Sequence, residues 1–185
     1  MTTKELVGKK VAILATNGVE QVELTEPRNF LKEHGATVHL ISLMQAGEQI
    51  QGCNWMELGD KFTVDKYVEE ANPDDYDMLL LPGGTWNPDS LRISDEAISF
   101  IKRFAQTDKL IAAICHSLWM LINAELVKGK KITSFPTIRK DLENAGAIWV
   151  DKEVVIDGNI ITSRSPLDLD VFNKAILNAL KSHVK

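Results

Sequence analysis

The sequence is poor in cysteine and has no long apolar run. Its 185 residues include only two cysteines, Cys53 and Cys115, which lie far apart and so exclude a disulfide framework and a Cys-x-x-Cys metal site. No stretch approaches the roughly 20 consecutive apolar residues that span a bilayer. The start, Met-Thr-Thr-Lys-Glu, lacks the apolar core of a signal peptide. We therefore expect a cytoplasmic protein with free thiols that does not enter a membrane.

The sequence also lacks an excess of positive charge. It contains 21 Lys and Arg against 26 Asp and Glu, which gives a net charge of -5. Nucleic acids attract a basic surface, so a nucleic-acid partner is not expected. The histidines at positions 34, 39 and 183 have no ligand-like spacing with acidic or thiol residues, so no metal is predicted. No Ser/Thr-rich phosphate loop follows the first apolar run, which argues against a flavin, and no cofactor is expected.

Short apolar runs alternate along the chain with amphipathic segments. The length suits a single domain over residues 1–185. Alternating strands and helices predict a three-layer α/β/α sandwich with a mostly parallel sheet. We expect strands at 9–16, 38–43, 78–81, 110–114 and 131–133, hairpins within 47–63 and 154–161, and helices at 25–34, 64–71, 89–106, 116–124, 136–144 and 167–180. The first helix is placed after residue 24 because Pro27 disfavours a helix interior.

The stretch Lys109 to Leu121, KLIAAICHSLWML, stands out chemically. Its apolar run ends abruptly at Cys115, and an amphipathic segment begins at once. Such a strand-to-helix corner holds a side chain out at the top of a sheet, near the positive end of a helix. This position suits a thiolate nucleophile. A buried cysteine that merely ends a strand is the alternative.

Two other loops fall at the same predicted edge of the sheet. In open α/β sheets, ligands bind beyond the carboxyl ends of the strands. The loop after the first strand carries Glu20, whose carboxylate can share a proton with the thiol or can stabilise a helix N-terminus. The loop after the third strand carries Gly83 and Gly84, which either present backbone N–H groups, together with that of His116, as an oxyanion hole or form a simple turn.

His116 is the histidine best placed in sequence to act as general acid or base. Because it directly follows Cys115, its side chain is expected on a different face, with only a loose approach to the thiol. Asp89 or another carboxylate could orient it, although Asp89 also suits the N-cap of its helix. Cys53 is expected to be a packed or interface thiol, and Trp86 either shapes a pocket or packs against a partner chain.

Together these segments resemble the PfpI family of the ThiJ/PfpI superfamily, which has a class I glutamine-amidotransferase-like fold. The resemblance covers roughly residues 9–180. The matching motifs are VAILATNGVEQVELTEPRNFLKEHGATVHLIS, LLLPGG, NPDSLR, AAICH and TSFPTIRKDLENAGAIWVDKEVVIDGNIITSR.

The resemblance implies a flavodoxin-like sandwich with a nucleophile elbow, in a dimer or larger homo-oligomer. It implies that Cys115 is the nucleophile, that Glu20 contacts its sulfur, and that His116 is the partner histidine. Gly84 and His116 would supply the oxyanion N–H groups. Asp89 matches the acidic residue that completes the site in such families, where it can come from a neighbouring subunit.

The chain departs from the family pattern directly after Cys115-His116. The family usually continues with Gly-Pro, whereas this sequence has Ser117-Leu118. The serine adds a Cβ and a hydroxyl beside the elbow, and the lost proline removes a helix-start signal. We expect the helix to persist, and the departure concerns the pocket floor and the substrate preference.

The resemblance implies an enzyme of the stress response, for which several activities are described. A thiolate adds readily to an aldehyde, so we expect a cysteine hydrolase or lyase acting on reactive carbonyls, of the glutathione-independent glyoxalase or protein deglycase type. Its partner would be a small carbonyl compound or a glycated protein. The alternatives are an intracellular cysteine peptidase and a redox sensor or chaperone with an oxidisable Cys115. Glutamine amidotransfer is disfavoured because no His-x-Glu pair follows His116.

Overall fold

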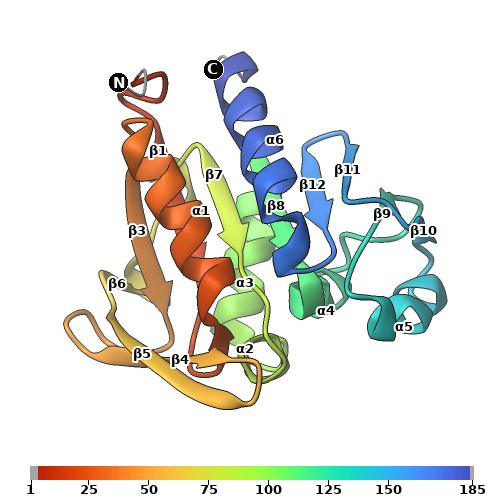
Figure 1. The fold of residues 1–185 in the computed structure, drawn as a ribbon, viewed down its shortest axis with the longest axis horizontal. Helices are drawn as coiled ribbons and strands as arrows, with labels where there is room; N and C mark the ends of the chain where they lie inside the picture. The colour runs from red at the N-terminus through yellow and green to blue at the C-terminus, as the bar shows by residue number, and fades with distance from the viewer. Residues whose placement is uncertain (1–3, 184–185) are drawn as a thin grey trace.

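The computed structural model describes residues 4–183, and their fold is a three-layer α/β/α sandwich (Figure 1). Within these residues the main sheet has seven strands in the order β11-β12-β8-β7-β1-β3-β6. All neighbours pair in parallel except β11 and β12, which form an antiparallel hairpin. The predicted flavodoxin-like class is thus confirmed. Residues 1–3, part of the stretch on which the expectation of no signal peptide was based, lie outside the described residues.

The strands of the main sheet are short and largely apolar, as expected for strands covered on both faces. They are β1 (Lys10–Leu14), β3 (Thr37–Ser42), β6 (Lys66–Tyr67), β7 (Met78–Leu81), β8 (Leu110–Ile114), β11 (Val154–Asp157) and β12 (Ile160–Ser163). Two small sheets flank it, one of β2 (Val19–Glu20), β4 (Gln49–Asn54) and β5 (Glu57–Thr63) and one of β9 (Lys131–Ile132) and β10 (Ile148–Trp149).

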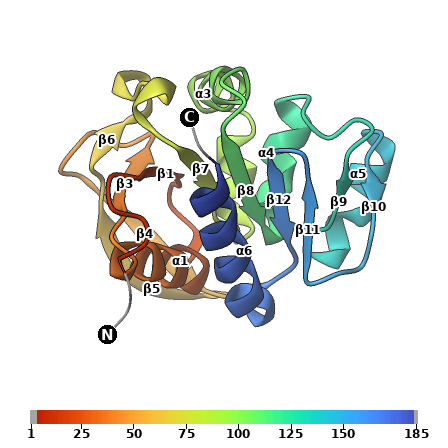
Figure 2. The same ribbon diagram turned by 90° about the horizontal axis from the view of Figure 1, so that it is seen from above.

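Helices cover both faces of the main sheet (Figure 2). On one side α1 (Gln21–Glu33) and α6 (Leu169–Ser182) pack over a core that includes Leu24 and Phe172. On the other, a second core includes Phe100 and Leu121. The helices there are α2 (Trp86–Leu91), α3 (Asp95–Ala105), α4 (Leu118–Asn123) and α5 (Arg139–Asn144). The two cores share the central strands, whose alternate side chains face opposite layers.

The predicted strands and both hairpins are confirmed, but three helix predictions were wrong in detail. The helix expected over 89–106 is two helices, because Ser94 starts α3 by accepting a hydrogen bond from Ala97 N–H at 3.2 Å. Helix α1 begins at Gln21 and keeps Pro27 inside it, so the proline did not delay the start. The helix expected over 64–71 is instead strand β6 and a single 3₁₀ turn, Val68–Glu70.

Strand order reverses between β1 and β7, because β3 lies on one side of β1 while β7 and β8 lie on the other. The strand arrows of β3, β7 and β8 point away from the end of the molecule where both termini lie (Figure 1). The loops after β1, β7 and β8 therefore meet at the opposite end, where an α/β sheet binds its ligand. The β4–β5 hairpin lies at this same end. Among residues 4–183, no helix is long and apolar enough to cross a bilayer.

Replacing a core leucine should show how strongly the fold depends on the central strands. We expect Leu80→Ala, which empties a fully buried site on β7, to lower the free energy of unfolding by about 2–5 kcal/mol. The matched control is Leu167→Ala, where 95% of the side chain is exposed and the change should stay within about 0.5 kcal/mol. Urea unfolding followed by circular dichroism measures both; equal losses would contradict the assigned core.

Candidate active site

Cys115 lies on a sharp turn between β8 and α4. Its backbone has φ = +66°, a left-handed conformation that non-glycine residues rarely adopt and that is strained for a side chain with a Cβ. The hydroxyl of Ser117 stabilises this turn: it accepts a hydrogen bond from Ile114 N–H at 2.9 Å and donates to Ile114 O at 2.7 Å. The elbow predicted from the sequence is therefore present, and it aims the thiol at the carboxyl end of the sheet.

Ser117 and Leu118, the residues at which the chain departs from the family pattern, lie inside the protein. Both side chains are fully buried, and neither lines the cavity beside the sulfur. The serine hydroxyl is directed at the backbone of β8 rather than at a ligand. The side chains of both residues therefore act within the protein interior and do not form part of the cavity wall.

The carboxyl group in contact with Cys115 belongs to Glu23, not to Glu20. Glu23 is fully buried in the first turn of α1, where its Oε2 accepts a hydrogen bond from Gly83 N–H at 2.8 Å and its carboxyl lies within hydrogen-bonding reach of the thiol. Glu20 is half-buried farther out, and its Oε2 accepts from Trp55 N–H at 3.1 Å. The prediction that Glu20 contacts the sulfur was therefore wrong. The glutamate in contact lies about one helical turn later in the sequence, because α1 starts earlier than predicted.

Burial dominates the electrostatics of the Glu23–Cys115 pair. Burial is the main cause that raises the pKa of Glu23 to about 8; the bond from Gly83 N–H opposes this shift, and the nearby charge of Glu20 adds to it. Burial, and then the charge of an ionised Glu23, raise the pKa of the Cys115 thiol. The two groups cannot both be ionised cheaply, so the pair holds a proton at neutral pH. A protonated Glu23 can donate to a thiolate, which removes the repulsion that Cys115 would otherwise meet.

His116 reaches the sulfur, contrary to expectation. Its Nδ1 lies 3.1 Å from Cys115 Sγ, although the residues are adjacent, because the left-handed turn at Cys115 rotates the two side chains toward each other. Its ring stacks on Phe135 at 4.8 Å and meets the edge of Trp119 at 5.3 Å. Burial lowers the pKa of His116, so its imidazole is neutral at pH 7 and can accept a proton.

The two glycines after β7 have different roles. Gly83 N–H is already bonded to Glu23, so its proposed place in an oxyanion hole is wrong. The N–H groups of Gly84 and His116 lie within hydrogen-bonding reach of the sulfur, where they stabilise negative charge. Gly84 has φ = +83°, and a Cβ there would lie 2.6 Å from Gly18 O, so only glycine fits this approach of backbones.

Asp89 does not join the site of its own chain. It is exposed in the first turn of α2 and does not line the cavity, and the helix begins three residues before it, so Asp89 is not the N-cap either. The buried polar residue near Asp89 is Asn87, in the first turn of α2. Its side chain accepts from Thr16 N–H at 2.8 Å and donates to Pro82 O and Gly83 O, which ties the loops after β1 and β7 together.

Cys115 opens into a cavity of about 460 Å³. Its walls come from all three predicted loops and from the tip of the β4–β5 hairpin. The lining residues are Gly18, Glu20, Glu23, Cys53, Trp55, Met56, Gly84, Thr85, Trp86, Cys115, His116, Phe135, Thr137 and Pro166. Cys53 is buried, as expected, and Trp86 contributes to the wall, with 62% of its side chain exposed. No lysine or arginine is among them, so the wall carries carboxyl groups and one imidazole but no fixed positive charge.

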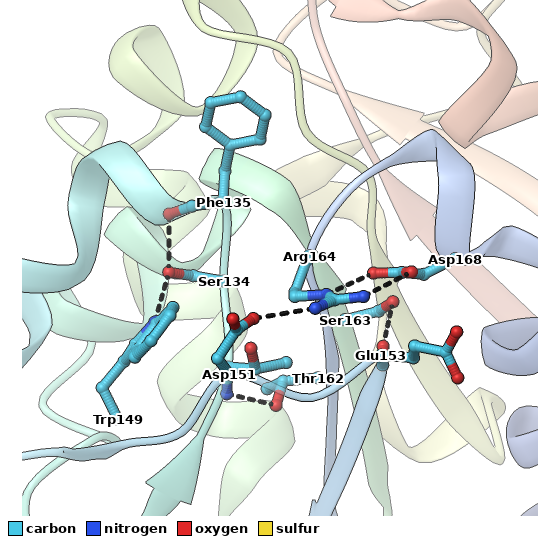
Figure 3. A network of polar contacts seen from close by, with 10 residues as sticks. Ser134, Phe135, Trp149, Asp151, Glu153, Thr162, Ser163, Arg164 and Asp168 are labelled. Carbon is cyan, nitrogen blue, oxygen red and sulfur yellow. Dashed lines mark hydrogen bonds and ion pairs between the residues drawn. The ribbon is translucent and has the colours of Figure 1, made fainter.

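A polar network holds in place the two segments that contribute Phe135 and Pro166 to the cavity lining (Figure 3). Arg164 bonds to both carboxyl oxygens of the buried Asp168, at 2.8 and 3.0 Å, and to Asp151 at 2.8 Å, which closes the turn that carries Pro166. Ser134 donates to Phe135 O and accepts from Trp149 Nε1, both at 2.9 Å. The ring of Phe135 points away from this network, toward His116.

Sequence reasoning missed Glu23, Asn87 and Thr137, together with the hairpin tip at Trp55 and Met56. A signal for Glu23 exists, because a carboxyl group among apolar residues on the inner face of a helix is unusual. The sequence carries no local signal for the role of the hairpin tip, since Trp55 and Met56 are largely exposed and come to line the cavity only because β4 lies beside β2.

The raised pKa of Glu23 predicts that stability depends on pH. The unfolded chain loses this proton near pH 4.5 and the folded chain keeps it to about pH 8. The resulting stabilisation is complete below pH 4.5 and is lost as the pH rises toward 8. Relative to Glu23→Gln, the free energy of unfolding of the wild type should therefore fall by up to about 1.4 kcal/mol per pH unit between about pH 5 and 8.

Guanidinium unfolding at several pH values measures this difference in the free energy of unfolding. The matched control is Glu26→Gln, an exposed position on the same helix, which should run parallel to the wild type. If Glu23→Gln also ran parallel, Glu23 would not hold a proton in the folded protein.

Comparisons with known proteins identify the family of this chain. The family model described as "DJ-1/PfpI family" matches residues 9–179. The chain is 43% identical over 175 residues to "Putative cysteine protease YraA" of Bacillus subtilis, a match that covers 95% of this chain and all of that protein. It is similar to uncharacterized staphylococcal proteins, such as that of Staphylococcus saprophyticus, with 43% identity over 94% of this chain and 99% of the relative.

Solved structures show the same similarity. A two-domain protein from Anabaena variabilis, with DJ-1/ThiJ/PfpI-like and ferritin-like domains, aligns with a TM-score of 0.87 and 38% identity over 93% of this chain, which spans about half (48%) of that chain. Drosophila melanogaster DJ-1beta aligns with a TM-score of 0.85 and 27% identity, over 95% of this chain and 91% of the other. With its elbow cysteine and buried glutamate, this chain belongs to the DJ-1/PfpI family.

Proposed function

We propose that the protein is a cysteine enzyme that converts small reactive carbonyl compounds, of the glutathione-independent glyoxalase or protein deglycase type. The observation that carries the proposal is the placement of Cys115 Sγ between the carboxyl group of Glu23 and His116 Nδ1, the latter at 3.1 Å. The cavity of about 460 Å³ is in the range of small-molecule sites, roughly 300–1,000 Å³.

Each group in the site has a function in this chemistry. The Cys115 thiol gives its proton to His116 as the sulfur adds to the aldehyde carbon of an α-oxoaldehyde. The N–H groups of Gly84 and His116 stabilise the oxygen that becomes negative, and His116 then passes the proton to that oxygen. His116, again neutral, moves the proton from that carbon to the neighbouring one while the hydroxyl proton passes to the neighbouring oxygen, which gives an enzyme thioester of a 2-hydroxy acid. Water then cleaves the thioester, so the net reaction adds one water and consumes no cofactor.

Glu23 maintains the charge of the nucleophile through these steps. With its pKa raised to about 8, its carboxyl group carries a proton at neutral pH and can donate to the Cys115 thiolate. We extend the proposal to location and assembly: a cytoplasmic homo-oligomer in which Asp89, exposed in its own chain, faces the site of a neighbouring copy. Glycated proteins would be substrates only where the modified side chain enters the cavity.

Peptide hydrolysis is the second candidate. It is supported by the similarity to the Bacillus subtilis protein named "Putative cysteine protease YraA", and by the contact between His116 and Cys115, which supplies the base that peptide hydrolysis needs. A peptide substrate needs space on both sides of the scissile bond. The cavity beside Cys115 is lined by the bulky side chains of Trp55, Met56 and Trp86, and its volume of about 460 Å³ suits the small carbonyl.

Methylglyoxal turnover without glutathione tests the proposal. We expect the wild type to form lactate, and Cys115→Ala to lose at least about 10³-fold in kcat/KM, since a covalent step cannot proceed without its nucleophile. Chiral chromatography of the product and the loss of methylglyoxal measure the rate. Equal rates in the two proteins would sink the thiolate mechanism.

Two parallel measurements separate the alternatives. Cys115-dependent cleavage of fluorogenic peptides, with no lactate formed, would favour the peptidase. Peroxide titration with intact-mass analysis would favour a redox sensor if the wild type gained two oxygens, Cys115→Ala gained none, and neither protein turned over methylglyoxal.

A further inference from the structure

Two aromatic side chains pack against the ring of His116. Phe135 stacks on one face of the ring with an interplanar angle of 25°, and Trp119 packs edge-on at 62°. Trp119 is itself fixed, because its Nε1 donates to Asp141 at 2.9 Å and the guanidinium of Arg92 lies 5.1 Å from its ring centre. These contacts define the plane of the imidazole, but aromatic packing alone does not determine which nitrogen carries the proton.

The nitrogen far from the sulfur has a polar partner. His116 Nε2 lies 3.2 Å from the hydroxyl Oγ1 of Thr137, which follows Phe135 by two residues and lines the same cavity. A histidine base is normally oriented by a group on its second nitrogen, and a carboxylate often takes that place. Here Asp89 is exposed and away from the cavity, so a hydroxyl occupies the position within the chain.

A hydroxyl differs from a carboxylate in one relevant respect, because it can both donate and accept. When the imidazole carries its proton on Nδ1, facing the sulfur, Nε2 accepts the hydrogen bond from Thr137. Before Nδ1 can take the proton of Cys115 Sγ, the neutral ring carries its proton on Nε2, which donates to the rotated hydroxyl of Thr137, and the same bond remains when the ring becomes imidazolium. The contact at 3.2 Å therefore persists through transfer of the proton between Cys115 and His116.

We infer that Thr137 is the positioning residue of His116: its hydroxyl orients the imidazole so that Nδ1 faces Cys115 Sγ in each protonation state. The inference rests on the proposed role of His116 as the base. Thr137 acts through the histidine and is not itself a catalytic residue. The rest of its side chain is exposed, so the hydroxyl rather than packing accounts for its function.

The test compares Thr137→Val, which keeps the shape and removes the hydroxyl, with Thr137→Ser, which keeps the hydroxyl. The readout is the rate of alkylation of Cys115 by iodoacetamide as a function of pH, which requires no knowledge of the substrate. We expect Cys115 in Thr137→Val to react about fivefold more slowly at pH 7, which corresponds to the loss of one hydrogen bond. The apparent pKa of the thiol should rise, because the imidazolium of His116 is less stabilised. Thr137→Ser should stay within about twofold of the wild type.

The matched control is Thr133→Val, four residues earlier on the chain. The Thr133 hydroxyl is buried without a hydrogen-bond partner in the described structure, and it does not line the cavity. The same chemical change should therefore leave the alkylation profile unaltered. Nitrogen-15 spectra of the His116 ring give a second readout, in which Thr137→Val should alter the Nε2 shift and Thr133→Val should not.

An unchanged profile and spectrum in Thr137→Val would overturn the inference, as would an equal loss in Thr137→Ser, which would assign the effect to packing. These outcomes are distinct from failure of the proposed function. Equal methylglyoxal turnover in wild type and Cys115→Ala would reject the carbonyl activity, whereas the alkylation series would still report on Thr137 and His116.

Discussion

The left-handed turn at Cys115 is the constraint on which the site depends. With φ = +66°, the chain leaves β8 so steeply that the sulfur is held at the edge of the sheet and the next residue folds back beside it. Such a conformation costs of order 1–3 kcal/mol and persists only where the surroundings enforce it. The paired hydrogen bonds of Ser117 with Ile114, and the bond from Phe135 N–H to Cys115 O, do so here.

The second constraint is the burial of a carboxyl group. Within residues 4–183, no Lys or Arg pairs with Glu23, and its bond to Gly83 N–H accommodates the carboxyl group in a largely apolar core. An isolated buried carboxylate would be costly, so the group retains a proton instead. Through Glu23, the nucleophile is linked to helix α1 and to the loop after β7. The three residues lie so close that a Cβ at position 83 would collide with Glu23 and Cys115.

Sequence reasoning succeeded where local pattern and topology agree. The apolar runs around Ile13, Leu80 and Ala112 predicted parallel strands, and the convergence of their loops followed from the fold class. It failed where a contact depends on the rotation of a helix or a backbone angle. Which glutamate contacts the sulfur, Glu23 or Glu20, depends on where α1 begins. The contact of His116 with the sulfur depends on the positive φ of Cys115, which a cysteine at that position does not indicate.

The β4–β5 hairpin has a consequence for how this protein could diverge. It belongs to a separate three-stranded sheet with β2, and its tip, Trp55 and Met56, lines the cavity while remaining largely exposed. The main sheet and both cores do not need these two side chains. Substitution at the tip can therefore alter what the cavity accepts at little cost to folding, and the hairpin is a module on which new specificities can evolve beside an unchanged elbow.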